Sequence, residues 1–371
     1  MKTIMKNSLC FLIGLFILFS FNCYAGETLT AQQKEAEVWY EKANSVDTLA
    51  LKIEYYTKAI ELDPEFVNAY NNRGYAYINL GEYQKAIDDC SKAVEIDPKL
   101  ASAYNNRGVA YINLGKYQKA IDDCSKAIEI DPKLANAYNY RGDAYKSLGE
   151  YQKAIDDCSK AIEIDPKLAN AYNSRGNVYV VGLGKYQKAI DDYSKAIEIN
   201  PNFVNAYSNR GYAYINLGEY QKAIDDCSKA VEIDPKFASA YNNRGAAYNK
   251  MGKYQKAIDD YNKAIELNPK FVSAYNNRGY AYANLGKYQK AIDDYSKAIE
   301  LNPSFASAYF SRGTAYTFQK SPTAAGGDFY QAGILFLKQN NTSQALICVD
   351  WMKKINPSSP LINKLMDQIN K

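Results

Sequence analysis

The most informative feature of this 371-residue chain is the complete absence of histidine. Without it, the chain can form no Ser-His-Asp or Cys-His nucleophile, no imidazole general base and no histidine-ligated metal site. The seven cysteines include no Cys-x-x-Cys pair, and no glycine-rich phosphate loop is present. We therefore predict no catalytic residue, no metal and no cofactor, and an enzyme is the least supported function class.

Long apolar runs are missing everywhere except at the N-terminus. There, two lysines precede an apolar stretch from Leu9 to Phe21, and Cys23-Tyr24-Ala25 has the small-residue pattern of a cleavage site. This predicts a signal peptide over residues 1–25, cleaved after Ala25, and an exported protein that is periplasmic or secreted. An uncleaved anchor is a rival interpretation, but the run is shorter than the roughly 20 residues that span a bilayer. Lipid attachment at Cys23 is a third and weaker interpretation.

Excess charge of either sign is also missing. Removing Lys2 and Lys6 from the 45 basic residues leaves 43 against 41 acidic ones, a net charge of +2. A nearly neutral chain has no electrostatic basis for binding nucleic acid or an anionic membrane. We predict no nucleic-acid partner, and no membrane span after signal cleavage.

What the chain does contain is one motif at regular spacing. AYNNRG occurs four times unchanged and four times with one or two substitutions. Its tyrosine recurs every 34 residues, apart from one spacing of 35 that ends at Tyr207, and prolines from Pro64 to Pro303 keep step with it. Within residues 67–100, two apolar stripes of helical spacing are separated by Gly81, and Pro98 ends the second. Each unit is therefore predicted to be an antiparallel helix hairpin.

These units resemble the tetratricopeptide repeat family. The family pattern asks for an aromatic at position 4, Gly at 8, Tyr at 11, Ala at 20, a bulky residue at 24, Ala at 27 and Pro at 32. The first full unit matches these positions with Tyr70, Gly74, Tyr77, Ala86, Cys90, Ala93 and Pro98. The resemblance implies an all-α fold, an α-solenoid of stacked antiparallel hairpins that form a right-handed superhelix. One hairpin cannot bury its own apolar faces, so stability must come from stacking.

The resemblance also suggests how the chain is divided. A linker at 26–32 leads to a weak first repeat at 33–66, seven full repeats at 67–305 and a degenerate repeat at 306–339. C-terminal helices and a cap follow at 340–371, and the last helix begins at about Pro360. A separate unit that begins at 326 fits the C-terminal sequence equally well. Residues 177–186 hold one extra residue, which predicts a bulge or hinge in the stack.

Several repeated residues are interpreted as structural. Gly74 in mid-helix costs about 1 kcal/mol relative to Ala, which indicates a close contact, with Ala86 and Ala93 as the expected partners. Arg73 is predicted to reach Asp89 on the second helix of its hairpin. Asp88 stands four residues before a lysine, Lys92, and is predicted to pair with it. Cysteines alternate with tyrosine at position 24, which indicates core filling rather than disulfides.

Asparagine and tyrosine on the first helix of each repeat are the candidate binding residues. In stacked tetratricopeptide arrays, positions 2, 5, 6, 9, 12 and 13 line the concave surface. An asparagine both donates and accepts hydrogen bonds, so a row of them can hold the backbone of an extended chain. The position-6 row is similar to the asparagine ladder of O-linked N-acetylglucosamine transferases, from which Tyr140, Ser174 and Ser311 depart. The predicted partner-binding residues are Asn71, Asn72, Tyr75, Asn105, Asn106, Tyr140, Asn209, Tyr212, Asn243, Asn277 and Tyr280.

We conclude from the sequence that the chain is a non-enzymatic scaffold that binds an extended or helical segment of a partner protein in a concave groove. Self-assembly of copies into an exported structural complex is the alternative. A third interpretation treats the asparagines as tolerated polar residues that internal duplication has copied. Few groove positions are basic, Lys146 and Lys250 among them, so recognition of an acidic C-terminus is disfavoured.

Overall fold

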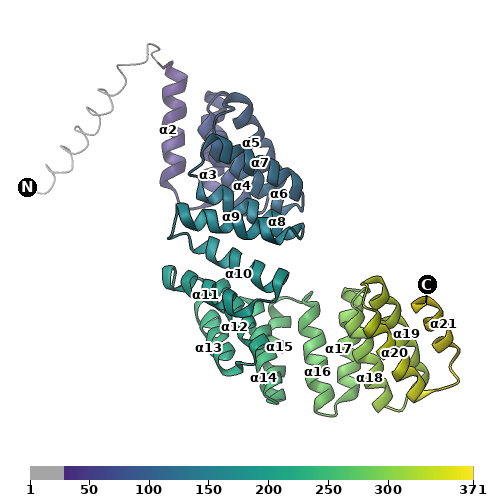
Figure 1. Cartoon of the computed structure of the whole chain (residues 1–371). Helices are drawn as coiled ribbons and strands as arrows, with labels where there is room; N and C mark the ends of the chain where they lie inside the picture. The colour runs from purple at the N-terminus through teal and green to yellow at the C-terminus, as the bar shows by residue number, and fades with distance from the viewer. Residues whose placement is uncertain (1–28, 371) are drawn as a thin grey trace, which may run out of the picture. The chain divides into compact units, whose positions relative to one another are not determined.

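A computed structural model describes residues 29–370; the predicted signal peptide lies outside this range. All 20 elements within these residues are α-helices, which confirms the predicted all-α fold (Figure 1). The described residues fall into two compact units, which divide between Ala144 and Tyr145. In the part of the chain described, no helix is long and apolar enough to cross a membrane.

Within each unit, helices pair as antiparallel neighbours joined by short turns (Figure 1). The first unit contains α2 (Ala31–Ser45), α3 (Leu49–Leu62), α4 (Val67–Leu80), α5 (Tyr83–Ile96), α6 (Ala101–Asn113) and α7 (Tyr117–Ile130). Helix α8 (Ala135–Ser147) runs past the end of the first unit. The second unit contains α9 (Tyr151–Ile164), α10 (Ala169–Leu183), α11 (Tyr186–Ile199), α12 (Val204–Leu217), α13 (Tyr220–Ile233), α14 (Ala238–Lys250), α15 (Tyr254–Leu267), α16 (Val272–Asn284), α17 (Tyr288–Leu301), α18 (Ala306–Phe318), α19 (Pro322–Lys338), α20 (Thr342–Ile355) and α21 (Pro360–Ile369).

The helix ends follow from local backbone chemistry. Gly81 takes the left-handed conformation, with φ 79°, and its amide and that of Glu82 donate to carbonyls in the last turn of α4. Helix α5 ends at Ile96 because the residue before Pro98 is extended, at φ −123° and ψ 95°. The same two signals recur in most of the repeats, so the hairpins have nearly equal lengths.

Alanine fills most of the core between the helices. Ala69, Ala86 and Ala93 have no exposed surface, and Ile87 packs with Ala86 and Ala110. Such small side chains allow the two helices of a hairpin to approach closely. Gly74 lies in this contact: a Cβ placed there would come 2.7 Å from Cys90 Sγ and 3.4 Å from the Ala86 carbonyl oxygen. Ala86 was expected, but the closest partner is the side chain at position 24 rather than Ala93.

Seven arginines at position 7 each join two consecutive hairpins. Arg210 donates from Nε and Nη2 to the two carboxylate oxygens of Asp226, both at 2.7 Å, within its own hairpin. Its Nη1 donates at 2.9 Å to Ser194 Oγ on the preceding hairpin. The predicted arginine–aspartate contact is confirmed in seven places: Arg73–Asp89, Arg107–Asp123, Arg175–Asp192, Arg210–Asp226, Arg244–Asp260, Arg278–Asp294 and Arg312–Asp328.

Asp88, which precedes the arginine-bound Asp89, behaves differently from the prediction. Asp88 does not pair with Lys92; it accepts a hydrogen bond from Gln84 Nε2 at 3.0 Å. Lys92 instead lies 3.3 Å from Glu95, one helical turn further on. Three- and four-residue spacings both place side chains on one helix face, and here the glutamate at the shorter spacing takes the lysine. These contacts are exposed and contribute little to stability.

Helix α10 absorbs the extra residue in its last turn, so that it has 15 residues where the other first helices of the full repeats have 13 or 14. Gly182 lies against the ring of Tyr151: a Cβ placed at Gly182 would come too close to Tyr151 Cγ for any other residue to fit. Val181 is pushed outward and is 68% exposed. The insertion therefore changes the surface at this helix end without interrupting the helix.

The C-terminal helices form one apolar cluster. Phe329 of α19 lies against Gly313 of α18, as the position-24 side chain does in a full repeat. Helix α21 covers the other side of α19, where Leu365 contacts Gly333 and Ile362 is buried. Helices α18 and α19 therefore pair as a hairpin, and α21 covers apolar surface that would otherwise meet water.

The Asp226→Asn substitution should destabilise the second unit by about 3 kcal/mol, because it leaves a largely buried guanidinium without its counter-charge. Burial already raises the pKa of the Asp226 carboxyl, and only the contact with Arg210 opposes that rise. The matched control is Asp225→Asn, since the Asp225 carboxylate accepts only an exposed hydrogen bond from Gln221. Urea unfolding followed by circular dichroism compares them; equal midpoints for the two variants would contradict a stabilising pair.

The cysteines at position 24 should resist alkylation in the native protein. Cys90, Cys124, Cys158 and Cys227 at position 24 are buried, as predicted for core residues, and Cys348 of α20 is buried as well. Burial raises the pKa of Cys90 and of Cys348 to about 12, so these thiols are protonated at neutral pH and poorly nucleophilic. Mass spectrometry after iodoacetamide treatment should find all five unlabelled without denaturant and labelled in urea. Rapid native labelling of Cys90 would show that the hairpins open readily.

Candidate partner-binding face

The predicted binding residues lie on the first helices of the repeats. We call positions 5, 6, 9 and 13 of these helices the asparagine–tyrosine face. In the first unit the face lies on α4, α6 and α8, and in the second on α10, α12, α14 and α16. Its residues differ in burial and in hydrogen bonding, so they do not all offer the same chemistry.

The position-6 asparagines of the second unit use their amide nitrogen between repeats. In each case Nδ2 donates to the residue at position 5 of the preceding repeat. The bonds run from Asn209 to Asn173 Oδ1 at 3.0 Å, from Asn243 to Ser208 Oγ at 3.1 Å and from Asn277 to Asn242 Oδ1 at 3.1 Å. The row is thus a chain of contacts that joins neighbouring repeats.

The first unit shows the same arrangement and requires one correction. Asn106 Nδ2 donates to Asn71 Oδ1 at 3.0 Å, and Asn72 Nδ2 donates to the Tyr40 hydroxyl at 2.8 Å. Asn71 and Asn105 are each only 8% exposed. The expectation that these two position-5 side chains face an open groove is therefore wrong, because the next repeat covers them.

The row is interrupted where position 6 is not asparagine. Tyr140 and Ser311 replace it in two repeats, and the position-5 oxygens that it would serve, Asn105 Oδ1 and Asn276 Oδ1, are buried without a partner. The serine side chain is too short to replace an amide donor, and tyrosine has a different reach. Two of the departures noted in the sequence thus coincide with unsatisfied acceptors.

The tyrosines at position 9 are the most exposed aromatic side chains of the face. Tyr75, Tyr212 and Tyr280 are 56%, 45% and 52% exposed. Tyr140 is half-buried, and burial, together with the nearby Tyr75 and Asp143, raises the pKa of its hydroxyl. The position-9 tyrosines lie where the sequence predicted an accessible aromatic, whereas Tyr140 is less accessible.

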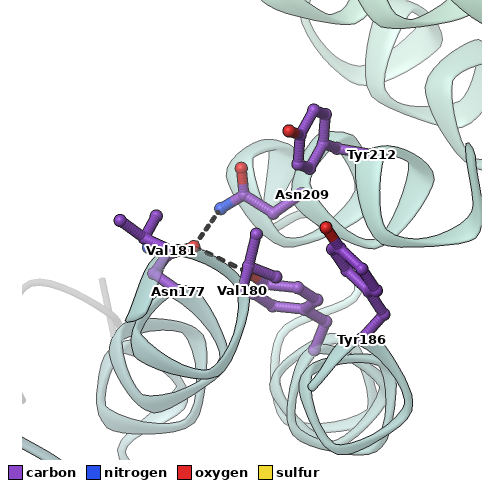
Figure 2. Close-up of a pocket in the computed structure, with 7 residues that line it drawn as sticks. Asn177, Val180, Val181, Tyr186, Asn209 and Tyr212 are labelled. Atoms are coloured by element: carbon purple, nitrogen blue, oxygen red, sulfur yellow. Dashed lines mark hydrogen bonds between the residues drawn. The ribbon is translucent and has the colours of Figure 1, made fainter. Parts of the chain in front are cut away.

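A pocket of about 420 Å³ opens beside the lengthened helix α10 (Figure 2). Its amide side chains are those of Asn177 and Asn209. Asn177 Oδ1 accepts hydrogen bonds from the Tyr193 hydroxyl at 2.8 Å and from Asn209 Nδ2 at 3.0 Å. Val180, Val181, Tyr186, Tyr193 and Tyr212 form the rest of the wall. Sequence analysis missed Asn177 and Val181; the extra residue at this point was the available signal.

A second pocket, of about 430 Å³, occupies the equivalent place three repeats later. Tyr280, Tyr288 and Tyr295 line one side, and Phe310, Ser311 and Phe318 of α18 and its C-terminal turn line the other. Phe318 is 57% exposed and stacks on Tyr288 with ring centroids 5.1 Å apart. No group of histidine, cysteine, aspartate or glutamate suited to a metal ion occurs in the residues that the structure describes.

Comparison with family models identifies the repeats. The model described as "Tetratricopeptide repeat" matches residues 67–100, 101–134, 135–168, 204–237, 238–271 and 272–305, and a "TPR repeat" model matches 181–218. The chain belongs to the tetratricopeptide repeat family. Such proteins are interaction modules for protein or peptide partners, and the fold is typical of non-enzymatic scaffolds.

Individual tetratricopeptide repeat proteins are similar over different lengths. Hsp70-Hsp90 organizing protein 3 of Arabidopsis thaliana is 36% identical over 59 residues, which are 16% of this chain and 10% of that protein. A crystal structure of a tetratricopeptide repeat protein from Parabacteroides merdae has 21% identity and a TM-score of 0.53, covering 67% of this chain and 98% of that one. Cut9–Hcn1 of the APC/C has 16% identity and a TM-score of 0.61, covering 91% and 67%. The two structures show a shared fold.

Asn277→Ser should cost about 1 kcal/mol, because it leaves Asn242 Oδ1 without its donor and so reproduces the gap at Ser311. The reciprocal change Ser311→Asn should stabilise the protein by a similar amount by serving Asn276 Oδ1. Urea unfolding of both variants beside wild type measures the effects. If neither change moves the midpoint, the inter-repeat hydrogen bonds contribute nothing to stability.

Proposed function

We propose that the chain is an exported, non-enzymatic scaffold that holds an extended or helical segment of a partner protein against its asparagine–tyrosine face, in a concave groove of the repeat array. The observation that carries the proposal is the exposure of tyrosine at position 9 in three repeats. Export rests on the signal-peptide pattern of residues 1–25.

Exposed tyrosines favour a protein partner. A tyrosine that is half exposed offers a rigid apolar ring and a hydroxyl, and such residues are enriched at the centres of interfaces. Tyr212 and Tyr280 occupy the same position of two repeats, so that one extended segment can meet both. Each also borders one of the two pockets.

Most charges of the repeats are placed elsewhere, although Asp143 and Lys250 stand on the face. The lysine–glutamate pairs, such as Lys229–Glu232 and Lys263–Glu266, lie within second helices. The arginines at position 7 are occupied by aspartates. A partner would therefore be recognised through amides and aromatic rings rather than through opposite charge, and binding should depend weakly on salt.

Selection of displayed random 12-residue peptides on the immobilised protein should yield peptides with dissociation constants in the micromolar range. The double variant Tyr212→Ala, Tyr280→Ala should weaken them at least tenfold, because it removes the aromatic contacts. The matched control is Leu217→Ala, Leu285→Ala, which trims exposed apolar side chains at the ends of the same two helices. Isothermal titration calorimetry measures each affinity.

Two outcomes would count against this proposal. Failure to enrich any peptide above the bare support would argue against a peptide-binding face. Concentration-dependent assembly in light scattering that the tyrosine substitutions abolish would instead favour self-assembly, because the face would then bind a second copy.

A further inference from the structure

The pocket beside α10 combines a hydrogen-bonding edge with an apolar wall, and this combination identifies its ligand. Asn177 Oδ1 accepts two hydrogen bonds and is saturated. Asn209 Nδ2 donates hydrogen bonds to Asn173 Oδ1 and Asn177 Oδ1. No described residue donates to Asn209 Oδ1, which therefore remains as an acceptor. Figure 2 shows this oxygen pointing away from Asn177, on the side of the Tyr212 hydroxyl.

Donors also lie at the same pocket. The Nδ2 of Asn177 makes no hydrogen bond to any described residue, and the hydroxyls of Tyr186 and Tyr212 belong to the lining. The site therefore offers at least one carbonyl acceptor and several neutral donors, with no charged group among its lining residues. A peptide group, which has one N–H and one C=O, complements such a set.

The apolar wall is specific to this repeat. Position 13 is asparagine in most of the full repeats, where its amide donates to the carbonyl at position 9, as Asn216 does to Tyr212. Here Val181 occupies the position and is 68% exposed, beside Val180. An exposed valine beside a pocket of about 420 Å³ favours an apolar side chain as its neighbour.

We infer that this pocket is a specificity subsite for an extended segment of a partner protein, which donates one backbone N–H to Asn209 Oδ1 and places the adjacent apolar side chain against Val180 and Val181. The inference rests on the proposed function and adds to it the position and the chemistry of the residue that is recognised. The amide row contributes an acceptor here because its nitrogen atoms are used between repeats.

Peptides selected on the full chain by display of random 12-residue sequences test the subsite. Val181→Asp should weaken them at least tenfold, because a carboxylate would be desolvated against the apolar side chain. Leu346→Asp, at a 42% exposed leucine on α20, is the matched control and should change affinity less than twofold. Circular dichroism checks that both variants are folded.

The acceptor is tested separately from the wall. Asn209→Ala should weaken binding about fivefold, whereas Asn262→Ala should not, because Asn262 accepts an inter-repeat hydrogen bond from Arg278 but lies on the second helix α15, away from the face and the pocket. Methylating each backbone nitrogen of a selected peptide in turn should reveal one position next to an apolar residue where methylation costs about tenfold in wild type and nothing in Asn209→Ala.

The outcomes separate this inference from the proposed function. Peptides that bind, lose affinity in the tyrosine double variant and ignore both Val181→Asp and Asn209→Ala would overturn the subsite and leave the scaffold proposal standing. If no peptide is enriched, both are overturned. A strong effect of Val181→Asp without any sensitive backbone nitrogen would also reject the subsite, because the apolar contact alone would then explain the binding.

Discussion

The arginine at position 7 is the contact on which the stack depends. Arg210 binds Asp226 in its own hairpin with two nitrogens and Ser194 of the preceding hairpin with the third, while its guanidinium lies 5.8 Å from the Tyr207 ring centroid. A hairpin of alanine-rich helices has little apolar surface to bury by itself. The arginine therefore joins hairpins by directional hydrogen bonds, where small side chains pack closely but bury little apolar surface. All three of its nitrogen atoms are used in these contacts.

The asparagine row follows from this close stacking. Because consecutive first helices lie side by side, the amide at position 6 reaches position 5 of the preceding repeat, and the pair satisfies polar groups that the contact buries. The nitrogen atoms of the row are thereby removed from ligand binding. A row of asparagines is thus not equivalent to a row of free amides: the atoms that remain available depend on what the neighbouring repeat already uses.

The sequence was sufficient to predict the fold, because the repeat spacing, Gly81 and Pro98 each strongly favour one local structure. It also predicted the Arg73–Asp89 contact, since only one acid on the second helix faces the first. It was insufficient for Asn71 and Asn105, because helical periodicity assigns a residue to a side of its own helix and does not show how deeply the next hairpin covers it. Lys92 had two acids within reach at helical spacing, and periodicity does not choose between them. Val181 was visible only as an extra residue, and its exposure depends on how Gly182 packs against Tyr151.

Nearly identical repeats pose a problem for recognition, because an array of equal sites holds a partner equally well in several registers. A register is selected only where the repeats differ. In the second unit two of the places where the repeats differ border a pocket: Val181 at the end of α10, and Phe310 and Phe318 of α18. Both retain the arginine–aspartate contact of the other repeats, Arg175–Asp192 and Arg312–Asp328, and differ in the side chains of the face. Specificity can therefore change at these positions without disturbing the arginine contacts that maintain the stack.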